Sequence, residues 1–97
     1  MLFMLRFYDK PDCLSLRQRW LPAHLDWLAR HQSVIKIAGS LRTEDCDTPD
    51  GACWLVEVDS FAEAHVCYLQ DPFWREGLRE RVELHSLSKA FDNPVTL

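Results

Sequence analysis

Two short segments alternate between apolar and polar residues, which predicts β-strands with one apolar face. The apolar faces consist of Phe3, Leu5 and Phe7 in residues 2–8, and of Trp54, Val56 and Val58 in residues 52–58. The opposite face of each segment carries one charged residue, Arg6 in the first and Glu57 in the second. Residues 33–41 and about 81–91 are also expected to be strands, because Val82 and Leu84 alternate with charged neighbours in the latter.

A helical period extends from about Asp12 to Gln32. Leu21, Leu25 and Leu28 share one stripe of this helix, and charged residues occupy the opposite side. Pro22 interrupts the pattern, because proline has no N–H and clashes with the preceding turn. It either kinks this helix or begins a second helical segment.

A second helix is predicted from Phe61 to about Gln70. Ser60 and Glu63 form a capping box, in which both side chains accept hydrogen bonds from free N–H groups of the first turn. Asp71 and Pro72 then end the helix, because the residue before a proline avoids helical backbone angles.

The resulting order of elements is βαββαβ, with a loop at residues 42–51 and a tail at residues 92–97. This order usually produces an α+β fold, in which both helices cover one face of a four-stranded antiparallel sheet. The uncovered face of four strands is too large an apolar patch for a stable monomer. We therefore expect a homodimer whose two copies pack sheet against sheet.

The composition restricts the class of protein and its partners. A chain of 97 residues with 47% hydrophobic and 27% charged residues suits a single domain over residues 1–97. The net charge of −4 argues against binding to nucleic acid, and the apolar runs are far shorter than the ~20 residues of a membrane-spanning helix. The first residues lack the pattern of a secretory signal, so we expect a cytoplasmic protein without nucleic-acid or membrane partners.

The cysteines and glycines of the chain do not predict a metal or a nucleotide cofactor. The four cysteines are far apart and form no C-x-x-C pair, so we expect reduced, unpaired thiols and assign no metal site. The three glycines are too well separated to form a phosphate-binding loop. We therefore expect no cofactor. The cysteines are Cys13, Cys46, Cys53 and Cys67.

Several short motifs follow one another in a characteristic order. They are Met1-Leu-Phe-Met-Leu through Asp9-Lys-Pro-Asp, Pro22-Ala-His-Leu, Ile37-Ala-Gly followed by Leu41, and Asp71-Pro-Phe. Together they resemble the YciI-like family over nearly the whole chain. The resemblance implies a ferredoxin-like subunit that forms a dimeric α/β barrel akin to muconolactone isomerases. It also implies a His-Asp pair in a pocket, which falls on His24 and Asp71, with Phe73 beside it.

Two positions depart from the pattern of that family. Leu21 stands where relatives often carry arginine, and Ser40 replaces the proline of the family's A-G-P stretch. The first change would remove an anion-binding contact. The second adds a hydroxyl that can donate a hydrogen bond to a ligand or to the backbone.

His24 has two interpretations. It lies next to the leucine stripe, and by itself it would fit a buried histidine held by a backbone carbonyl. The resemblance favours a general base, because a carboxylate such as Asp71 fixes the tautomer and raises the basicity of the other ring nitrogen. Asp71 alone also fits the end of a helix before proline. The remaining histidines are interpreted as structural, and they are His31, His65 and His85.

Arg6 also has two interpretations. We favour a cross-strand ion pair with Glu57, and the alternative is that Arg6 points into the dimer cavity and binds an anionic substrate group. Trp74 follows the Asp71-Pro-Phe motif and is a candidate for the wall of the pocket.

These residues predict a cofactor-free enzyme of the lyase or isomerase type. His24 and Asp71 would perform acid/base chemistry on a small cyclic or aromatic acid-like molecule. The candidate substrate-binding residues are Arg6, Ser40, Phe73 and Trp74. Two other functions fit the same cleft, a non-catalytic module for ligand binding or assembly, and metal-free monooxygenase chemistry.

Overall fold

The strands of the computed structural model, which describes residues 1–91, form one antiparallel sheet. The strands of this sheet are β1 (Leu2–Asp9), β2 (Ile35–Leu41), β3 (Gly51–Glu57) and β4 (Arg79–Leu87). Their order in the sheet is β2-β3-β1-β4, so β1 and β3 occupy the centre. The expected α+β, ferredoxin-like βαββαβ fold is confirmed.

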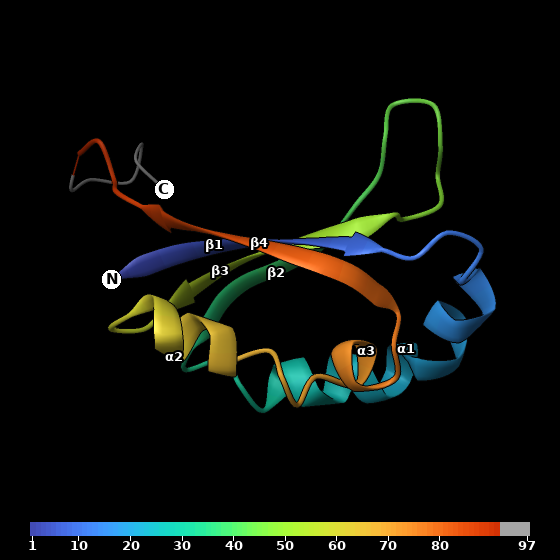
Figure 1. Cartoon of the computed structure of the whole chain (residues 1–97), viewed down its shortest axis with the longest axis horizontal. Coiled ribbons are helices and arrows are strands. Elements are labelled where there is room, and N and C mark those ends of the chain that lie inside the picture. Colours follow the sequence, from blue (N-terminus) through green and yellow to red (C-terminus); the bar gives the residue numbers. More distant parts are fainter. Residues whose placement is uncertain (92–97) are drawn as a thin grey trace.

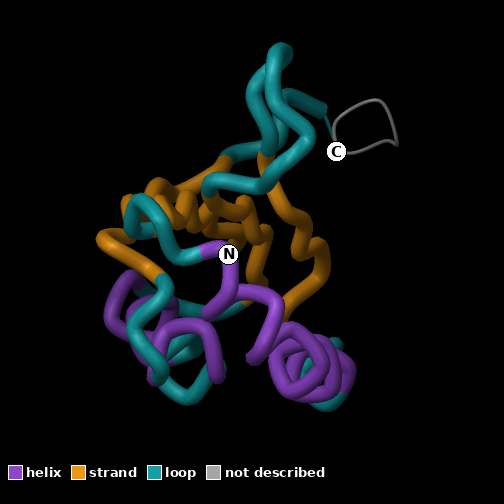
Figure 2. Tube along the Cα trace, turned by 90° about the vertical axis from the view of Figure 1, so that its right-hand side faces the viewer, coloured by secondary structure: helices purple, strands orange, loops and turns teal. Residues whose placement is uncertain are grey.

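The helices lie together on one face of this sheet (Figure 1). They are α1 (Leu14–Ala29), α2 (Phe61–Val66) and the single turn α3 (Pro72–Arg75). A view turned by 90° shows the strands on one side of the molecule and the helices on the other (Figure 2). No helix within residues 1–91 is both long and apolar enough to cross a membrane. The predicted tail at residues 92–97 lies outside the described residues.

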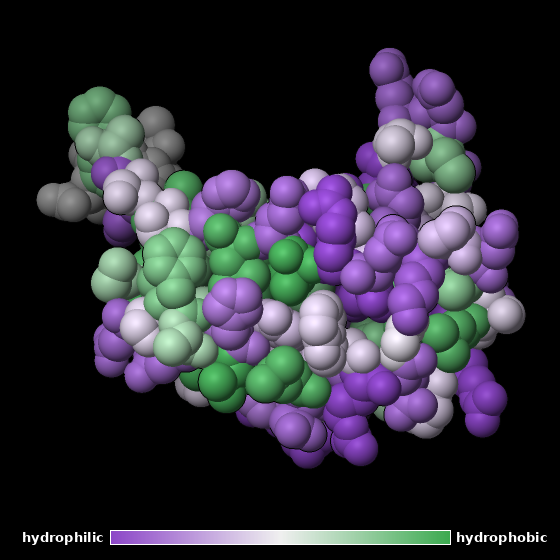
Figure 3. Space-filling model, in the orientation of Figure 1, coloured by the Kyte–Doolittle hydropathy of each residue, from purple (hydrophilic) through white to green (hydrophobic). Residues whose placement is uncertain are grey.

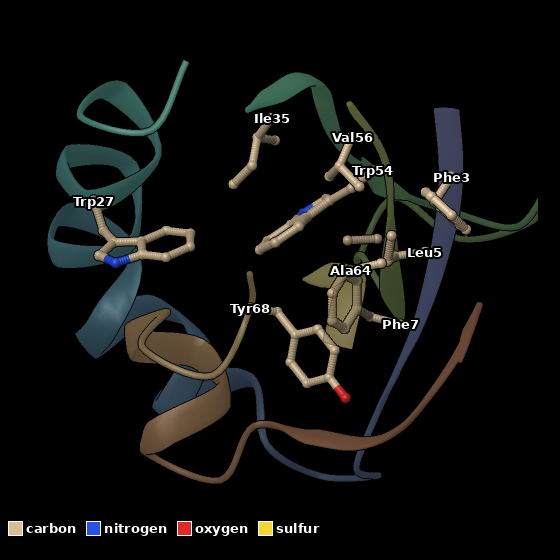
Figure 4. Close-up of a cluster of buried hydrophobic side chains, with 10 residues drawn as sticks. Phe3, Leu5, Phe7, Trp27, Ile35, Trp54, Val56, Ala64 and Tyr68 are labelled. Atoms are coloured by element: carbon tan, nitrogen blue, oxygen red, sulfur yellow. The ribbon is translucent and has the colours of Figure 1, made fainter. Parts of the chain in front are cut away.

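The core fills the space between the sheet and the helices. Phe7 and Trp54 come from the two central strands, and their ring centroids lie 4.6 Å apart. Trp27 of α1 stacks on Trp54 from the helical side, with centroids 5.9 Å apart (Figure 4). Burying each large aromatic side chain stabilises the fold by roughly 1.5–3 kcal/mol. The apolar faces of β1 and β3 therefore pack in the core, as the alternation of their residues predicts.

Helix α1 runs unbroken through Pro22, so this proline neither divides the helix nor begins another segment. Of the leucine stripe, only Leu28 packs against the core. Leu25 is 53% exposed, whereas the buried residues of α1 are Arg17, His24 and Trp27. Two of the three buried positions are polar, which an analysis of hydrophobic periodicity does not detect.

Helix α2 is shorter than predicted, because it ends at Val66 and not near Gln70. Its capping box forms in part: Ser60 Oγ accepts the N–H of Glu63 at 3.1 Å, but Glu63 Oε2 accepts from Asp59. The turn after Val66 places Tyr68 in the core, where its ring lies against that of Phe7. Burial of this side chain thus outweighs continuation of the helix.

The predicted ion pair between Arg6 and Glu57 does not fit the register of the sheet. In the register of the central strands, Arg6 lies opposite Cys53, whereas Glu57 lies opposite Leu2. Four positions along a strand correspond to about 13 Å, so the predicted pair of Arg6 with Glu57 is wrong. The Glu57 carboxylate lies 3.4 Å from the amino group of Met1. The helix-free face of the sheet is hollowed between the loop at residues 42–50 and the residues that follow β4 (Figure 3).

Candidate active site

His24 and Asp71 meet in the structure, although 47 positions separate them in the chain. His24 lies in the middle of α1, and Asp71 precedes α3, which packs against α1. The imidazole Nδ1 is 2.6 Å from Asp71 Oδ1, and the two residues are 7% and 0% exposed. A hydrogen bond in such a place is strengthened because water does not compete for it.

Helix α3 holds the imidazole of His24 in two ways. Asp71 caps this helix, since its Oδ1 accepts the N–H of Phe73 at 3.1 Å, and Pro72 occupies the first turn, where proline is favoured. The ring of Phe73 stacks on the ring of His24, with centroids 3.9 Å apart and planes inclined by 13°. The carboxylate and the aromatic ring together fix the position and orientation of the imidazole.

The position of Asp71 selects the tautomer of His24. An ionised carboxylate only accepts hydrogen bonds, so the ring proton resides on Nδ1 and the lone pair on Nε2. When Nε2 takes up a second proton, the charge of Asp71 stabilises the imidazolium that forms. The pair is therefore arranged to accept and return a proton.

A cavity of about 350 Å³ lies between α1 and the strands β2 and β3, and His24 is part of its wall. This volume lies within the range of small-molecule sites. The leucine stripe of α1 lines this cavity, which explains why Leu21 and Leu25 remain exposed. The large apolar residues of the wall are Leu14, Leu21, Leu25, Leu28, Trp54 and Phe73.

Two buried arginines reach the same cavity and share one carboxylate. Arg79 Nη1 is 2.6 Å from Asp9 Oδ1, and Arg17 Nη2 is 3.2 Å from Asp9 Oδ2. Arg17 Nη2 also donates to the carbonyl of Gly51 at 3.3 Å. Burial lowers the pKa of Arg79, and the charges of Asp9 and Asp71 oppose this effect. The guanidinium remains a cation, because the pKa of arginine lies far above neutrality.

The profile of the YCII-related domain family matches residues 1–88, which include His24, Asp71 and every residue that lines the cavity. The chain belongs to the YCII-related domain family. The resemblance drawn from the motifs is thus confirmed over nine-tenths of the sequence. No curated protein matches the chain.

Solved structures similar to this YCII-related domain include an enzyme with a bound ligand. The 5-chloro-2-hydroxyhydroquinone dehydrochlorinase of Burkholderia phenoliruptrix AC1100, in complex with 2,5-dihydroxybenzoquinone, is 26% identical in sequence with a TM-score of 0.83. The alignment covers 93% of this chain and 96% of that protein. The two chains therefore share their fold over nearly their entire lengths.

Two further structures share the fold at lower identity. A putative antibiotic biosynthesis monooxygenase from Bacteriodes thetaiotaomicron VPI-5482 is 14% identical with a TM-score of 0.57, over 94% of this chain and 90% of that one. An uncharacterized NIPSNAP domain protein from Burkholderia xenovorans is 19% identical with a TM-score of 0.51, over 97% of this chain and 99% of that one. These likenesses show the fold of the YCII-related domain alone.

Two of the predicted substrate-binding residues line the cavity of this YCII-related domain. Ser40 is on β2, and its Oγ accepts a hydrogen bond from Arg42 Nη1 at 2.8 Å. Phe73 lies beneath His24, as described above. The hydroxyl of Ser40 is thus already hydrogen-bonded to Arg42, which also lines the cavity.

The other two predicted residues are not brought to the cavity. Trp74 follows Phe73 in α3 and therefore points in a different direction. Its ring packs against Tyr68, with centroids 4.5 Å apart, on the side of the core. Arg6 lies on the helix-free face, where its guanidinium is 4.1 Å from the ring centroid of Tyr8. Its role toward an anionic group remains a prediction about the dimer.

The sequence analysis missed Asp9, Arg17 and Arg79. Single charged residues such as Arg17 and Arg79 are usually solvated, so neither had a distinctive signal. Asp9 stands in the first motif of the resemblance, but no role was assigned to it. One indication existed for Arg17, because it precedes His24 by seven residues and so shares its face of the helix. Within residues 1–91, no group of three or more His, Cys, Asp or Glu side chains is suited to holding a metal ion.

Proposed function

We propose that this YCII-related domain is an enzyme that performs an elimination or isomerisation on a small cyclic or aromatic acid-like molecule, with His24 as the acid/base group. The observation that carries the proposal is the buried hydrogen bond between His24 and Asp71 in the wall of a largely apolar cavity. A general base needs a fixed position next to a space that admits the substrate and little water. The contacts with Asp71 and Phe73 give the imidazole a fixed position, and the cavity is large enough for a small ring.

The structural similarity to a dehydrochlorinase supports the choice of elimination. That enzyme acts on a chlorinated hydroxyhydroquinone, a six-membered ring with acidic hydroxyl groups. For the present chain we propose a substrate of the same general class, a hydroxylated ring that carries a leaving group.

The proposed step involves one proton and one electron pair. His24 Nε2 takes a proton from the substrate, and the electron pair of the broken bond forms a new double bond in the ring system. The leaving group departs from the ring with its own electron pair, so the net change is the loss of HX. In an isomerisation the imidazolium returns the proton to another atom instead. General acid–base catalysis of this kind contributes about 10²–10⁴-fold to the rate.

The experiment is a test of turnover on a defined panel. The purified protein is incubated with chlorinated and unchlorinated hydroxyhydroquinones and with lactones, and halide release and the ultraviolet spectrum are followed. We expect turnover of at least one ring with a leaving group, which His24→Gln abolishes and His65→Gln preserves. His65 is the matched control, because it is an exposed histidine of α2 whose Nδ1 bonds to the hydroxyl of Tyr68, outside the cavity.

The outcome that contradicts the proposal is a folded protein that binds members of this panel without converting any of them. Such a result would make the cavity a binding site. Oxygen uptake with these substrates would instead point to monooxygenase chemistry.

We also propose that the chain works as a homodimer whose two copies pack their helix-free sheet faces together. Met4 and Leu55 pair across the two central strands on this face and are partly exposed. Light scattering tests the proposal: we expect a dimer, and Leu55→Glu should give monomers. The control is Leu69→Glu, which adds the same charge at an exposed leucine outside the sheet. A wild-type monomer would contradict the proposal.

A further inference from the structure

The wall of the cavity carries an uneven distribution of charge. Arg17, Arg42 and Arg79 belong to the wall, and within the described residues no aspartate or glutamate does. The loop at residues 42–50 contains several carboxylates, and none of them lines the cavity. The chain as a whole has a net charge of −4, so the cations at this place are not a consequence of its composition.

The nearby carboxylates do not balance these cations. Arg17, Arg42 and Arg79 contribute three positive charges, and the two carboxylates in contact with the site, Asp9 and Asp71, contribute two negative charges. One positive charge is therefore unmatched while His24 is neutral, and protonation of His24 adds another. A cavity with low-dielectric walls and an excess positive charge favours an anionic ligand.

Arg17 and Arg79 both have nitrogens without an acceptor among the described residues, but the guanidinium of Arg79 lies over the rings of Phe7 and Phe73. We therefore assign such a ligand to Arg17. Its hydrogen bonds within the described residues use Nε and Nη2, which leaves Nη1 without a protein acceptor. Its contacts with Asp9 are 3.2 Å long, whereas Arg79 holds the other oxygen of the same carboxylate at 2.6 Å. Asp9 is thus bound mainly by Arg79, and an anion in the cavity can compete for Arg17.

The spacing of Arg17 and His24 suits a single ring between them. Seven residues of helix separate the backbones of Arg17 and His24 by about 10 Å, on the same face. Both side chains lean toward Phe73, whose ring centroid is 5.2 Å from Arg17 Cζ and 3.9 Å from the centroid of the imidazole. A six-membered ring with two polar groups is small enough to contact both side chains, once a hydrogen bond of about 2.8 Å is added at each group. Leu21, on the intervening turn, and Trp54 supply apolar surface for the ring.

We propose that the cavity selects rings that carry an ionised oxygen group, a carboxylate or an ionised hydroxyl, and that Arg17 binds this group with Arg42 at the mouth. The inference rests on the proposed function, because it takes the cavity beside His24 as the substrate site. It assigns a different part of the same site, Arg17 and Arg42, to anion recognition.

The test compares an acid with its neutral amide by isothermal titration calorimetry. The probes are 2,5-dihydroxybenzoate and 2,5-dihydroxybenzamide, which have the same ring and nearly the same size. We expect the wild-type protein to bind the acid about tenfold or more tightly than the amide. Arg17→Gln and Arg42→Gln should each weaken binding of the acid and leave binding of the amide unchanged, and Arg17→Lys should retain part of the preference.

The matched control is Arg30→Gln. Arg30 is an exposed arginine just after α1 and pairs with Asp26 on the solvent side, so its removal should change neither affinity. Circular dichroism establishes that each variant is folded, and Arg42→Gln, at an exposed residue, provides the test if Arg17→Gln unfolds. Equal affinities for acid and amide, binding of neither probe, or an acid preference that survives both substitutions would overturn the inference.

One further variant separates this inference from the proposed function. His24→Gln should lose turnover but keep the preference for the acid, because the anion binds to the arginines and not to the imidazole. A preference for the acid in a protein that converts no substrate would leave the inference standing and the proposed function refuted. Turnover of neutral and ionised rings with equal efficiency would leave the proposed function standing and refute the inference.

Discussion

Two buried ionic clusters border the same cavity, and they differ in whether a proton can move within them. In the cluster of His24 and Asp71, one member is the side chain that gains and loses a proton near neutral pH. In the cluster of Asp9, Arg17 and Arg79, both cations keep their charge. The pair of His24 and Asp71 can therefore exchange a proton, whereas the cluster of fixed charges can hold elements of the fold together.

The supporting cluster joins three separate elements. Asp9 ends β1, Arg17 lies in the first half of α1, and Arg79 begins β4. Their contacts hold the helix and the two strands together at one end of the cavity, beside the pair of His24 and Asp71. The comparison implies that damage to His24 or Asp71 should appear mainly as lost activity, and loss of Asp9 mainly as lost stability.

The largest effect is expected at the cluster that exchanges a proton. If the proposed function holds, His24→Gln should lower kcat/KM by about 10²–10⁴-fold, and Asp71→Asn by less, because asparagine keeps the cap of α3 but not the charge. The double variant should be scarcely worse than His24→Gln. Steady-state kinetics measures these losses, and a thermal melt checks that each variant is folded. If the losses of the two single variants multiply in the double variant, the two residues do not act as a unit.

The supporting cluster should respond in its free energy of unfolding. Asp9→Asn leaves two buried guanidinium groups without their carboxylate, and breaking a buried ion pair costs about 3–5 kcal/mol. Urea denaturation followed by tryptophan fluorescence measures this loss. A variant as stable as the wild-type protein would mean that the arginines find other partners and that the cluster does not support the fold.

Cys67 provides a half-buried acid whose pKa is shifted mainly by burial. Burial raises the pKa of its thiol to about 11, and a hydrogen bond with the backbone opposes this only in part. The folded state therefore keeps its proton at a pH where the unfolded state loses it. This contribution to stability is complete below pH 9 and is lost as the pH rises toward about 11.

The effect of Cys67 should be about 1 kcal/mol, after discounting for its partial exposure. The measurement is the free energy of unfolding of wild-type protein and Cys67→Ser on both sides of this range. Serine keeps a donor for the carbonyl of Ala64, which the thiol contacts at 3.1 Å. Identical pH profiles would show that another group is responsible, and Tyr68, whose pKa burial also raises, is the first to consider.

The smallest effect is expected at an ion pair on the surface. Arg30 and Asp26 are 3.3 Å apart and largely exposed. Asp26→Asn should reduce the free energy of unfolding by about 0.5 kcal/mol or less, because water screens the pair and the side chains lose entropy in forming it. The same urea titration as for Asp9→Asn gives the comparison. Equal losses in the two variants would remove the distinction between buried support and surface pairing.

The sequence predicts much of the fold because alternation reports burial directly. Phe3, Leu5 and Phe7 of β1 are completely buried on the side that their pattern indicates. The end of α2 and the partner of Arg6 are predicted less well. The first depends on how Tyr68 reaches the core, and the second depends on strand register, which a single strand does not specify.

The residues of the candidate site also divide into those that the sequence predicts and those that it does not. His24, Asp71 and Phe73 are accessible to prediction because each lies in a short motif with a recognisable order. Arg17 and Arg79 lie in no such motif, and the motif that contains Asp9 does not indicate its partners. The sheet and helix bring the three residues together from three elements with no shared pattern. Trp74 differs from its neighbour Phe73 only in its direction from α3, which adjacency in the sequence does not reveal.

The cap of α3 connects the backbone amide of Phe73 to the carboxylate that also holds His24. Asp71 Oδ1 accepts both the N–H of Phe73 and the bond with His24 Nδ1, so the two donors share one oxygen. A change in the charge of the imidazole alters the strength of the other bond. The ¹⁵N chemical shift of the Phe73 amide should therefore follow every protonation or ligand titration of His24, which gives nuclear magnetic resonance a spectroscopic reporter of the site that requires no turnover.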